Sequence, residues 1–289
     1  MSHVFVSPHP DDAALSCGGL IARLRERGEA VAIVTLFSGA GSGDRLTAYQ
    51  RLALGFGAQE KWRPGDDAPE SDAAGFVPTP EQVMAVRRAE DESFARLAGA
   101  SVVFVNLPDA VFRGYQGDAE LMGAPRPDDP PPTAELRAVL DSLAPATIYL
   151  PLSVGGHVDH RAARRAGMAL LAEPGSPYRD RTLFYEDFPY AHTTGFERLD
   201  QLDPEIVPSL PAGATLTPEY VPIGDVIDRK LAGLRVYASQ HGRLFGGDDP
   251  MARDVRDHAA RVGRIGGVES AERYWRVTTI GTGSGGVNS

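Results

Sequence analysis

Short apolar runs alternate with longer amphipathic segments along the first 190 residues of the chain. The apolar runs, which predict buried strands, cover residues 4–6, 30–37, 101–107, 147–152 and 182–188. The segments with apolar residues at helical spacing cover 15–27, 79–97, 133–143 and 160–171. Strands that are apolar throughout are typical of a parallel sheet with helices on both faces. We therefore expect an α/β fold, a Rossmann-like three-layer sandwich with a mostly parallel central sheet.

The rest of the chain predicts two helices, 225–239 and 250–262, and a strand at 273–280. We expect residues 1–280 to form a single α/β domain, whose late helical and strand part begins at about residue 225, and 281–289 to be a disordered tail. Stretches rich in Gly and Pro interrupt the pattern at 38–44, 62–75 and 117–132. Long loops of this kind are either functional lids or disordered segments, and both interpretations stay open.

Composition limits the classes of partner. The 289 residues include 29 Lys and Arg against 39 Asp and Glu, for a net charge of −10, which disfavours binding to nucleic acid and to anionic membranes. No apolar run approaches the roughly 20 residues that span a bilayer. A single cysteine, Cys17, excludes a disulfide within the chain, and the first residues lack the pattern of a secretion signal. We predict a cytoplasmic protein with a small-molecule partner, without nucleic-acid binding or membrane insertion.

Two clusters of His and Asp, SPHPDD and GGHVDH, each follow a predicted strand. Ligands of open α/β sheets bind beyond the carboxyl ends of the strands, so the two clusters are expected to meet at one edge of the sheet. Two imidazoles and one carboxylate suit a catalytic zinc ion that keeps coordination positions open. We interpret His9, Asp12 and His160 as ligands of one Zn2+ per chain, or of another divalent metal.

The other members of the two clusters fit the remaining steps of amide hydrolysis. Asp11 is predicted to be the general base that takes a proton from the attacking water. His157 is predicted to act as an acid or to stabilise the oxyanion, and Asp159 to hold the imidazole of His157. Each residue also has a plain structural interpretation, because Asp12 could simply cap the helix that follows it.

The combination of PHPDD with a downstream GGHVDHR resembles the PIG-L/LmbE-like family of zinc-dependent N-deacetylases, which includes N-acetylglucosaminyl deacetylases. The likeness extends to RRAEDESFARLAGA, to NLPD and to KLAGLRVYASQ, so that it spans residues 3 to about 240. It implies the zinc ligands and catalytic roles given above, contacts of Arg87 and Asp109 with sugar hydroxyls, and a homo-oligomer as one option. The alternatives are a solvated face or a pair with Glu90 for Arg87, and a turn for Asp109.

Two positions depart from the pattern of that family. Ala13 stands where the first motif commonly continues with Glu, and its effect is expected to be limited to a lost hydrogen bond. Gly155 stands where some members carry an aromatic hydroxyl. Its small size predicts a roomier pocket or a different substrate.

We therefore predict a metal-dependent hydrolase that removes an acetyl group from an N-acetylated amino sugar or sugar conjugate. One alternative is an amidase or deacylase acting on a thiol conjugate or a glycosylated natural product. Another is a non-catalytic carbohydrate- or nucleotide-binding module. A degenerate binding module would be expected to lack some of the proposed ligands and catalytic residues, and all of them are present here.

Overall fold

The computed structural model describes residues 2–56, 78–202 and 214–279, in which seven strands form one sheet in the order β3-β2-β1-β4-β5-β7-β6. The strands are β1 (Ser2–Ser7), β2 (Ala30–Thr35), β3 (Ser101–Phe104), β4 (Thr147–Pro151), β5 (Thr182–Tyr185), β6 (Ala214–Pro222) and β7 (Ala271–Thr279). Neighbours among β1 to β5 pair in parallel, whereas β7 is antiparallel to both β5 and β6. The sheet is therefore mostly parallel, as predicted.

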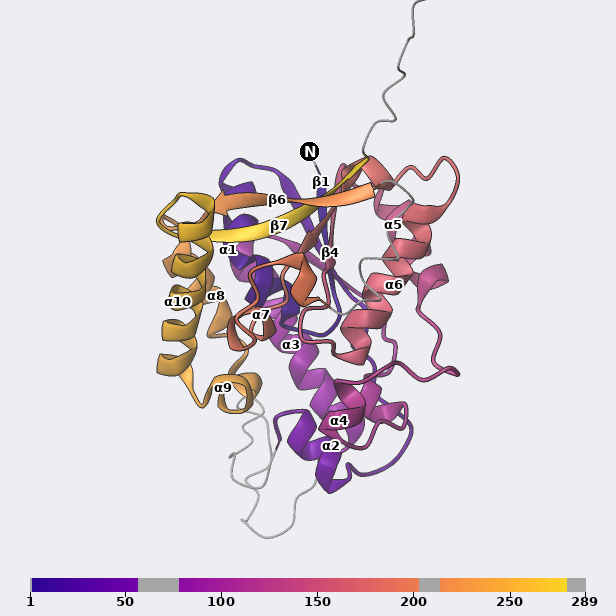
Figure 1. The fold of residues 1–289 in the computed structure, drawn as a ribbon. Coiled ribbons are helices and arrows are strands. Elements are labelled where there is room, and N and C mark those ends of the chain that lie inside the picture. The colour runs from indigo at the N-terminus through magenta and orange to yellow at the C-terminus, as the bar shows by residue number, and fades with distance from the viewer. Residues whose placement is uncertain (1, 57–77, 203–213, 280–289) are drawn as a thin grey trace, which may run out of the picture.

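Helices cover both faces of this sheet (Figure 1). They are α1 (Asp12–Glu26), α2 (Ala48–Ala53), α3 (Pro80–Ala98), α4 (Asp118–Leu121), α5 (Thr133–Leu143), α6 (Val158–Ala172), α7 (Tyr190–Thr193), α8 (Ile227–Leu234), α9 (Ala238–Phe245) and α10 (Asp248–Gly266). The predicted α/β class with a three-layer arrangement is confirmed. The predicted loop at 62–75 and the predicted tail at 281–289 lie outside the described residues. No helix within the described ranges combines the length and the apolar composition of a membrane span.

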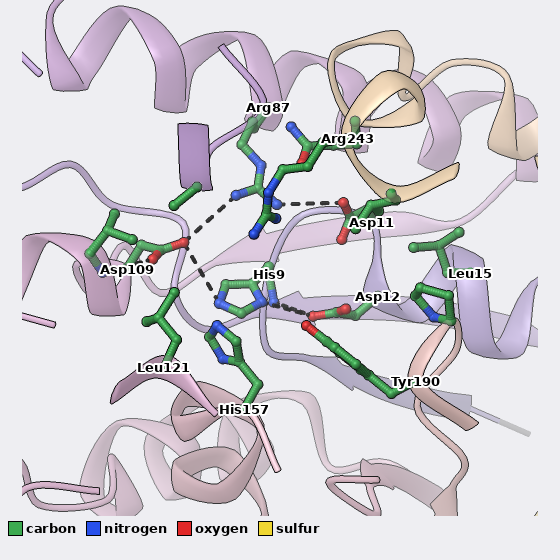
Figure 2. Close-up of a pocket in the computed structure, with 15 residues that line it drawn as sticks. His9, Asp11, Asp12, Leu15, Arg87, Asp109, Leu121, His157, Tyr190 and Arg243 are labelled. Carbon is green, nitrogen blue, oxygen red and sulfur yellow. Dashed lines mark hydrogen bonds and ion pairs between the residues drawn. The ribbon is translucent and has the colours of Figure 1, made fainter. Parts of the chain in front are cut away.

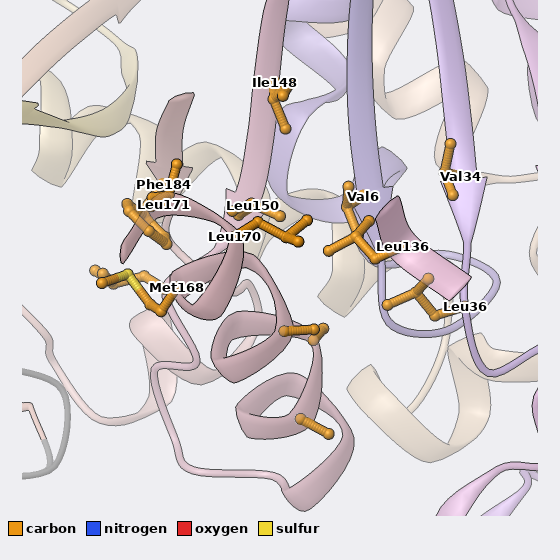
Figure 3. Close-up of a cluster of buried hydrophobic side chains, with 14 of the residues drawn as sticks. Val6, Val34, Leu36, Leu136, Ile148, Leu150, Met168, Leu170, Leu171 and Phe184 are labelled. Carbon is orange, nitrogen blue, oxygen red and sulfur yellow. The ribbon is translucent and has the colours of Figure 1, made fainter. Parts of the chain in front are cut away.

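Alternate side chains of the strands pack into two hydrophobic clusters on opposite faces of the sheet. Val6 and Leu150 join Leu170 in the cluster beneath α5 and α6 (Figure 3). Phe5 points to the other face, where its ring stacks on Tyr149 with 4.3 Å between centroids, and the same cluster includes side chains of α1 and α8. Because helices cover both faces, most side chains on either face of the central strands are apolar, which explains the continuous apolar runs.

The structure corrects the expected single helix at 225–239. The segment forms two helices, α8 and α9, separated around Tyr237. The hydroxyl of Tyr237 donates to Asp91 at 2.7 Å, and its ring lies 5.8 Å from that of Phe94, so burial of this side chain against α3 fixes the break. The break turns α9 toward the end of the sheet where the two polar clusters lie (Figure 1).

Strand β6 was not predicted from the sequence. It lies at the edge of the sheet and includes Pro218, which pairs with Trp275 of β7. Proline cannot donate a hydrogen bond to a neighbouring strand, and edge strands are where a sheet accepts it. On the sequence alone, Pro218 disfavours the prediction of a strand. The strand order explains why it is accepted, because β6 is an edge strand.

Glu272 at the start of β7 joins three elements through a buried network. Its carboxylate accepts hydrogen bonds from the backbone N–H groups of Gly19 (2.8 Å) and Leu20 (2.9 Å) in α1. It also accepts from Lys230 Nζ of α8 at 2.7 Å and from the hydroxyl of Tyr274 at 2.8 Å. The side chains of Lys230 and Glu272 are only 5 % and 6 % exposed, so this ion pair is shielded from water.

Candidate active site

The two polar clusters meet beyond the carboxyl ends of β1 and β4, as predicted. His9 Nδ1 lies 3.2 Å from Asp12 Oδ2, and His160 Nε2 lies 3.3 Å from the same oxygen. In a tetrahedral zinc site with bonds of about 2.0–2.1 Å, neighbouring ligand atoms are about 3.3 Å apart. Each of these two distances therefore matches the one expected between neighbouring ligands of a zinc ion.

The outer nitrogen of each of these imidazoles is held by a buried carboxylate. His9 Nε2 lies 2.9 Å from Asp159 Oδ2, and His160 Nδ1 lies 2.6 Å from Asp187 Oδ1. Burial lowers the pKa of His9, but its bonds to Asp12 and Asp159 outweigh burial and raise that pKa to about 10. Carboxylates commonly support metal-binding histidines in this way. The surroundings are therefore suited to a cation.

Other side chains lie close enough to join the same centre. Ring nitrogens of His9, His157 and His160 lie within 4.8 Å of one another. Ligand atoms of His9, Asp109 and Asp159 form a second group within the same limit. His9 is common to both groups and is the centre of the arrangement.

Asp159 does not hold His157 as the sequence analysis expected. Its Oδ2 contacts His9 and accepts the N–H of Ala110 at 3.0 Å, and Arg113 Nη2 lies 2.5 Å from its Oδ1. Only the backbone N–H of Asp159 contacts His157. Burial raises the pKa of Asp159, but His9 and Arg113 lower it more strongly, so this carboxylate stays charged.

His157 is held by the backbone. It is the N-cap of α6, and its Nδ1 accepts the N–H of Asp159 at 3.2 Å. Because Nδ1 accepts, the ring proton belongs on Nε2, which leaves an N–H donor on a side chain that lines the pocket. Burial and the nearby His9 lower the pKa of His157 well below its ordinary value. A neutral donor therefore fits this residue better than an imidazolium.

Asp11 adopts a backbone conformation that is rare for residues other than glycine. It is the N-cap of α1, with a φ of 114°. Such positions cost free energy and cluster at active sites. Burial raises the pKa of Asp11 to about 7, although Arg87, with Nη2 3.5 Å from Oδ2, opposes this shift. A carboxylate with a pKa near neutrality is suited to accept and release protons.

Arg87 and Asp109 both line the pocket (Figure 2). Arg87 donates to the carbonyl of Pro10 at 3.2 Å, and its Nη1 lies 3.7 Å from Asp109 Oδ2. The alternative pairing with Glu90 is wrong, because Glu90 accepts from Ser239 at the start of α9. Asp109 is also a turn residue, since its carboxylate accepts the N–H of Val111 at 3.1 Å.

Asp187 and Tyr190 belong to the site and were missed by the sequence analysis. Both follow β5, in the sequence EDFPY, where two acidic residues end an apolar strand. The ring of Tyr190 packs edge to face on His160 at 5.5 Å, and its hydroxyl points toward Asp12 (Figure 2). The acidic pair after the strand was a signal that could have led to this segment.

Gly155 does not enlarge the pocket, because Tyr190 fills the space beside it. A Cβ atom at Gly155 would lie only 2.6 Å from Tyr190 Cβ, and the φ of 85° is one that favours glycine. An aromatic side chain on α7 thus occupies the space that a side chain at position 155 would need. The expectation of a roomier pocket at this point is corrected.

Ala13, the other departure from the family pattern, is buried in the hydrophobic cluster around Phe5. Its backbone N–H donates to Ser7 Oγ at 2.9 Å, and the hydroxyl of Ser7 donates to the carbonyl of His9 at 2.7 Å. Ser7 therefore stabilises the loop that bears His9 in this chain.

Substitution Gly155→Ala tests the packing of Tyr190. We expect it to destabilise the fold by about 2–4 kcal/mol, because an unfavourable φ costs about 1–2 kcal/mol and the clash with Tyr190 adds to it. Gly175→Ala is the matched control, since Gly175 also has a positive φ of 69° but no atom lies within 4 Å of the point that its Cβ would occupy. Chemical denaturation gives both values, and equal losses for the two variants would contradict this account.

Comparison with known proteins agrees with the fold and the motifs. Residues 4–171 match the PIG-L family, described as GlcNAc-PI de-N-acetylase. The chain is 32% identical over 286 residues to a 2'-N-acetylparomamine deacetylase of Streptomyces fradiae, covering 97% of this chain and 83% of that protein. It is 30% identical over 202 residues to a 2'-N-acetylparomamine deacetylase of Niallia circulans, covering 65% of this chain and 66% of that one.

Solved structures share the fold at lower identity. The zinc-inhibited form of teicoplanin deacetylase has a TM-score of 0.71 at 20% identity, covering 98% of this chain and 100% of that one. N,N'-diacetylchitobiose deacetylase from Pyrococcus horikoshii has a TM-score of 0.56 at 19% identity, covering 96% and 84%. Because the family match covers more than half of the chain and the Streptomyces relative aligns along nearly all of it, the chain belongs to the PIG-L family.

Proposed function

We propose that this chain is a zinc-dependent N-deacetylase that hydrolyses the acetamido group of an amino sugar in a glycosylated small molecule. The observation that supports the proposal most is that one nitrogen of His9 and one nitrogen of His160 lie within 3.3 Å of the same oxygen of Asp12, beside a carboxylate, Asp11, whose pKa lies near 7. The names of the two curated relatives, both 2'-N-acetylparomamine deacetylases, support the amino-sugar substrate.

In this proposal His9, Asp12 and His160 hold the cation, which supplies Lewis-acid chemistry to the water and the amide when it is bound. Asp11 accepts the proton that the attacking water loses, and its pKa of about 7 allows this at neutral pH. The Nε2–H of His157 donates to the amide oxygen as negative charge develops there. Asp11 then returns its proton to the departing nitrogen, so that water and amide become acetic acid and amine, and the acid ionises to acetate at neutral pH.

The proposal is tested by the release of amine and acetate from N-acetylglucosaminides and from 2'-N-acetylparomamine, with and without a chelator. Compounds with longer acyl groups in place of acetyl show whether the enzyme is a deacetylase or a broader deacylase. We expect turnover of acetylated compounds that a chelator abolishes and zinc restores. No turnover of any acylated amino sugar with zinc present would overturn the proposal.

Zinc affinity should depend on the carboxylate behind His160. We expect His160→Ala to lose bound zinc, and Asp187→Asn to weaken zinc binding by about 10- to 100-fold, because Asp187 orients the imidazole. Asp200→Asn is the control, since that carboxylate is exposed and, within the described part of the chain, pairs with Arg198. Metal content after dialysis against competing chelators gives the affinities, and wild-type affinity in Asp187→Asn would refute the supporting role.

A further inference from the structure

Two arginines line the candidate active-site pocket, and they differ in their surroundings. Arg87 is only 6 % exposed and lies near the carboxylates of Asp11 and Asp109. Arg243 is exposed, yet Figure 2 shows its side chain pointing into the same pocket. Among the described residues Arg243 has no hydrogen-bond or ion-pair partner. Because this side chain is exposed, its guanidinium is accessible to a ligand.

The position of Arg243 is set by firm anchoring of the residues just before it. Ser239 donates to Glu90 through its backbone N–H at 2.8 Å and its hydroxyl at 2.6 Å. Gln240 donates to the carbonyl of Leu54 at 3.1 Å, and His241 bonds to the carbonyl of Leu234 at 2.8 Å. His241 is thus a structural residue that does not line the pocket. These contacts fix the start of α9 and hold Arg243 at the pocket.

The charges of the pocket favour an anion beside Arg243. The lining carries three carboxylates, Asp11, Asp12 and Asp109, and the two arginines. A divalent cation on the proposed ligands would offset two of the three negative charges of this lining. The lining from α9 is Gln240, Arg243 and Leu244, without an acidic side chain. Burial raises the pKa of the Tyr190 hydroxyl, and the positive charge of Arg243 acts in the opposite direction and lowers it.

We infer that Arg243 is a specificity-determining residue that binds a carboxylate of the substrate, so that the preferred substrate is an N-acetyl amino-sugar glycoside with an acidic group outside the reacting sugar. This inference rests on the proposed N-deacetylase function. A guanidinium presents paired N–H donors that match the two oxygens of a carboxylate, and such charge-assisted pairs are stronger than neutral hydrogen bonds. The apolar side chains of Leu15 and Leu244, which also line the pocket, would contact the carbon skeleton that carries the acidic group.

The test compares three N-acetylglucosaminides of matched size, whose phenyl aglycones carry a carboxylate, a carboxamide or an aminomethyl group. With the zinc-loaded wild type we expect kcat/KM to fall in that order. Arg243→Glu should lower the ratio of kcat/KM for the carboxylate over the aminomethyl compound by about 10- to 100-fold. Arg253→Glu is the control, because Arg253 is an exposed arginine of α10 that does not line the pocket, and it should leave the ratio unchanged.

Binding measurements separate this inference from the proposed function. Calorimetry of the carboxylate glycoside should give a Kd at least about tenfold weaker for Arg243→Glu than for the wild type, whether or not turnover occurs. Equal Kd values, or the same kcat/KM ratio in Arg243→Glu and Arg253→Glu, would overturn the role of Arg243. Binding that depends on Arg243 without release of amine would support this role and contradict the deacetylase function instead.

Discussion

Asp11→Asn is expected to lower kcat for deacetylation by about a hundred- to ten-thousand-fold while leaving the zinc content unchanged. Asparagine has nearly the same shape as aspartate but cannot take a proton from water. Burial holds the pKa of the Asp11 carboxyl at about 7, so the substitution removes a base that is matched to neutral pH. Arg87 keeps its contact with Asp109, 3.7 Å from Nη1, so the pocket should keep its shape. Steady-state amine release and metal analysis of the same preparation give both quantities.

Asp12→Asn is the informative comparison for this prediction. The carboxylate of Asp12 contacts both His9 and His160, so its loss should remove the metal together with the activity. Metal analysis alone should thus distinguish the roles of the two adjacent aspartates, because Asp11→Asn should contain zinc and Asp12→Asn should not. If Asp11→Asn kept kcat within tenfold of the wild type, another group would have to be the base.

Glu272→Ala is expected to lower the free energy of unfolding by about 3–5 kcal/mol, because it leaves a buried charge without its partner. Lys230 is 5 % exposed and would lose its counter-ion, and the N–H groups of Gly19 and Leu20 would lose their acceptor. Urea denaturation monitored by tryptophan fluorescence measures the change.

The ion pair of Glu219 with Arg276 provides the control for this second prediction. It joins β6 to β7 near the surface, where the two side chains are 42 % and 38 % exposed, so Glu219→Ala should cost no more than about 1 kcal/mol. Lys230→Met in the Glu272→Ala background should recover part of the stability by removing the unpaired charge. Equal costs for Glu272→Ala and Glu219→Ala would show that the buried network is unimportant.

The sequence predicts the parts of the fold that depend on local pattern. Strands buried on both faces appear as continuous apolar runs, and the segments between them have apolar residues at helical spacing, so the α/β class follows. β6 does not follow, because Pro218 is acceptable only at the edge of a sheet and the strand order depends on the whole chain. The break before α9 likewise depends on the burial of Tyr237 against a helix that lies far away in the sequence.

The same distinction holds for the site. His9, Asp12 and His160 were predictable as neighbours because strand ends in a parallel sheet lie at one edge. The acidic pair after β5 marks the segment of Asp187, but the contact of Asp187 with His160 depends on the position of β5 beside β4, which the sequence alone does not give. The partner of Asp159 depends on the direction of one side chain in the first turn of α6. The local sequence pattern therefore predicts which polar residues lie at the same edge of the sheet. The packing of the whole chain determines which of their side chains are in contact.

The bonds from Glu272 to α1 have a consequence for the order of events during synthesis. Asp11 and Asp12 stand at the start of α1, and every proposed metal ligand has been made once residue 160 leaves the ribosome. The acceptor that secures the middle of α1 is added more than a hundred residues later. The newly made chain would thus have its ligands long before it has the support that keeps them in place.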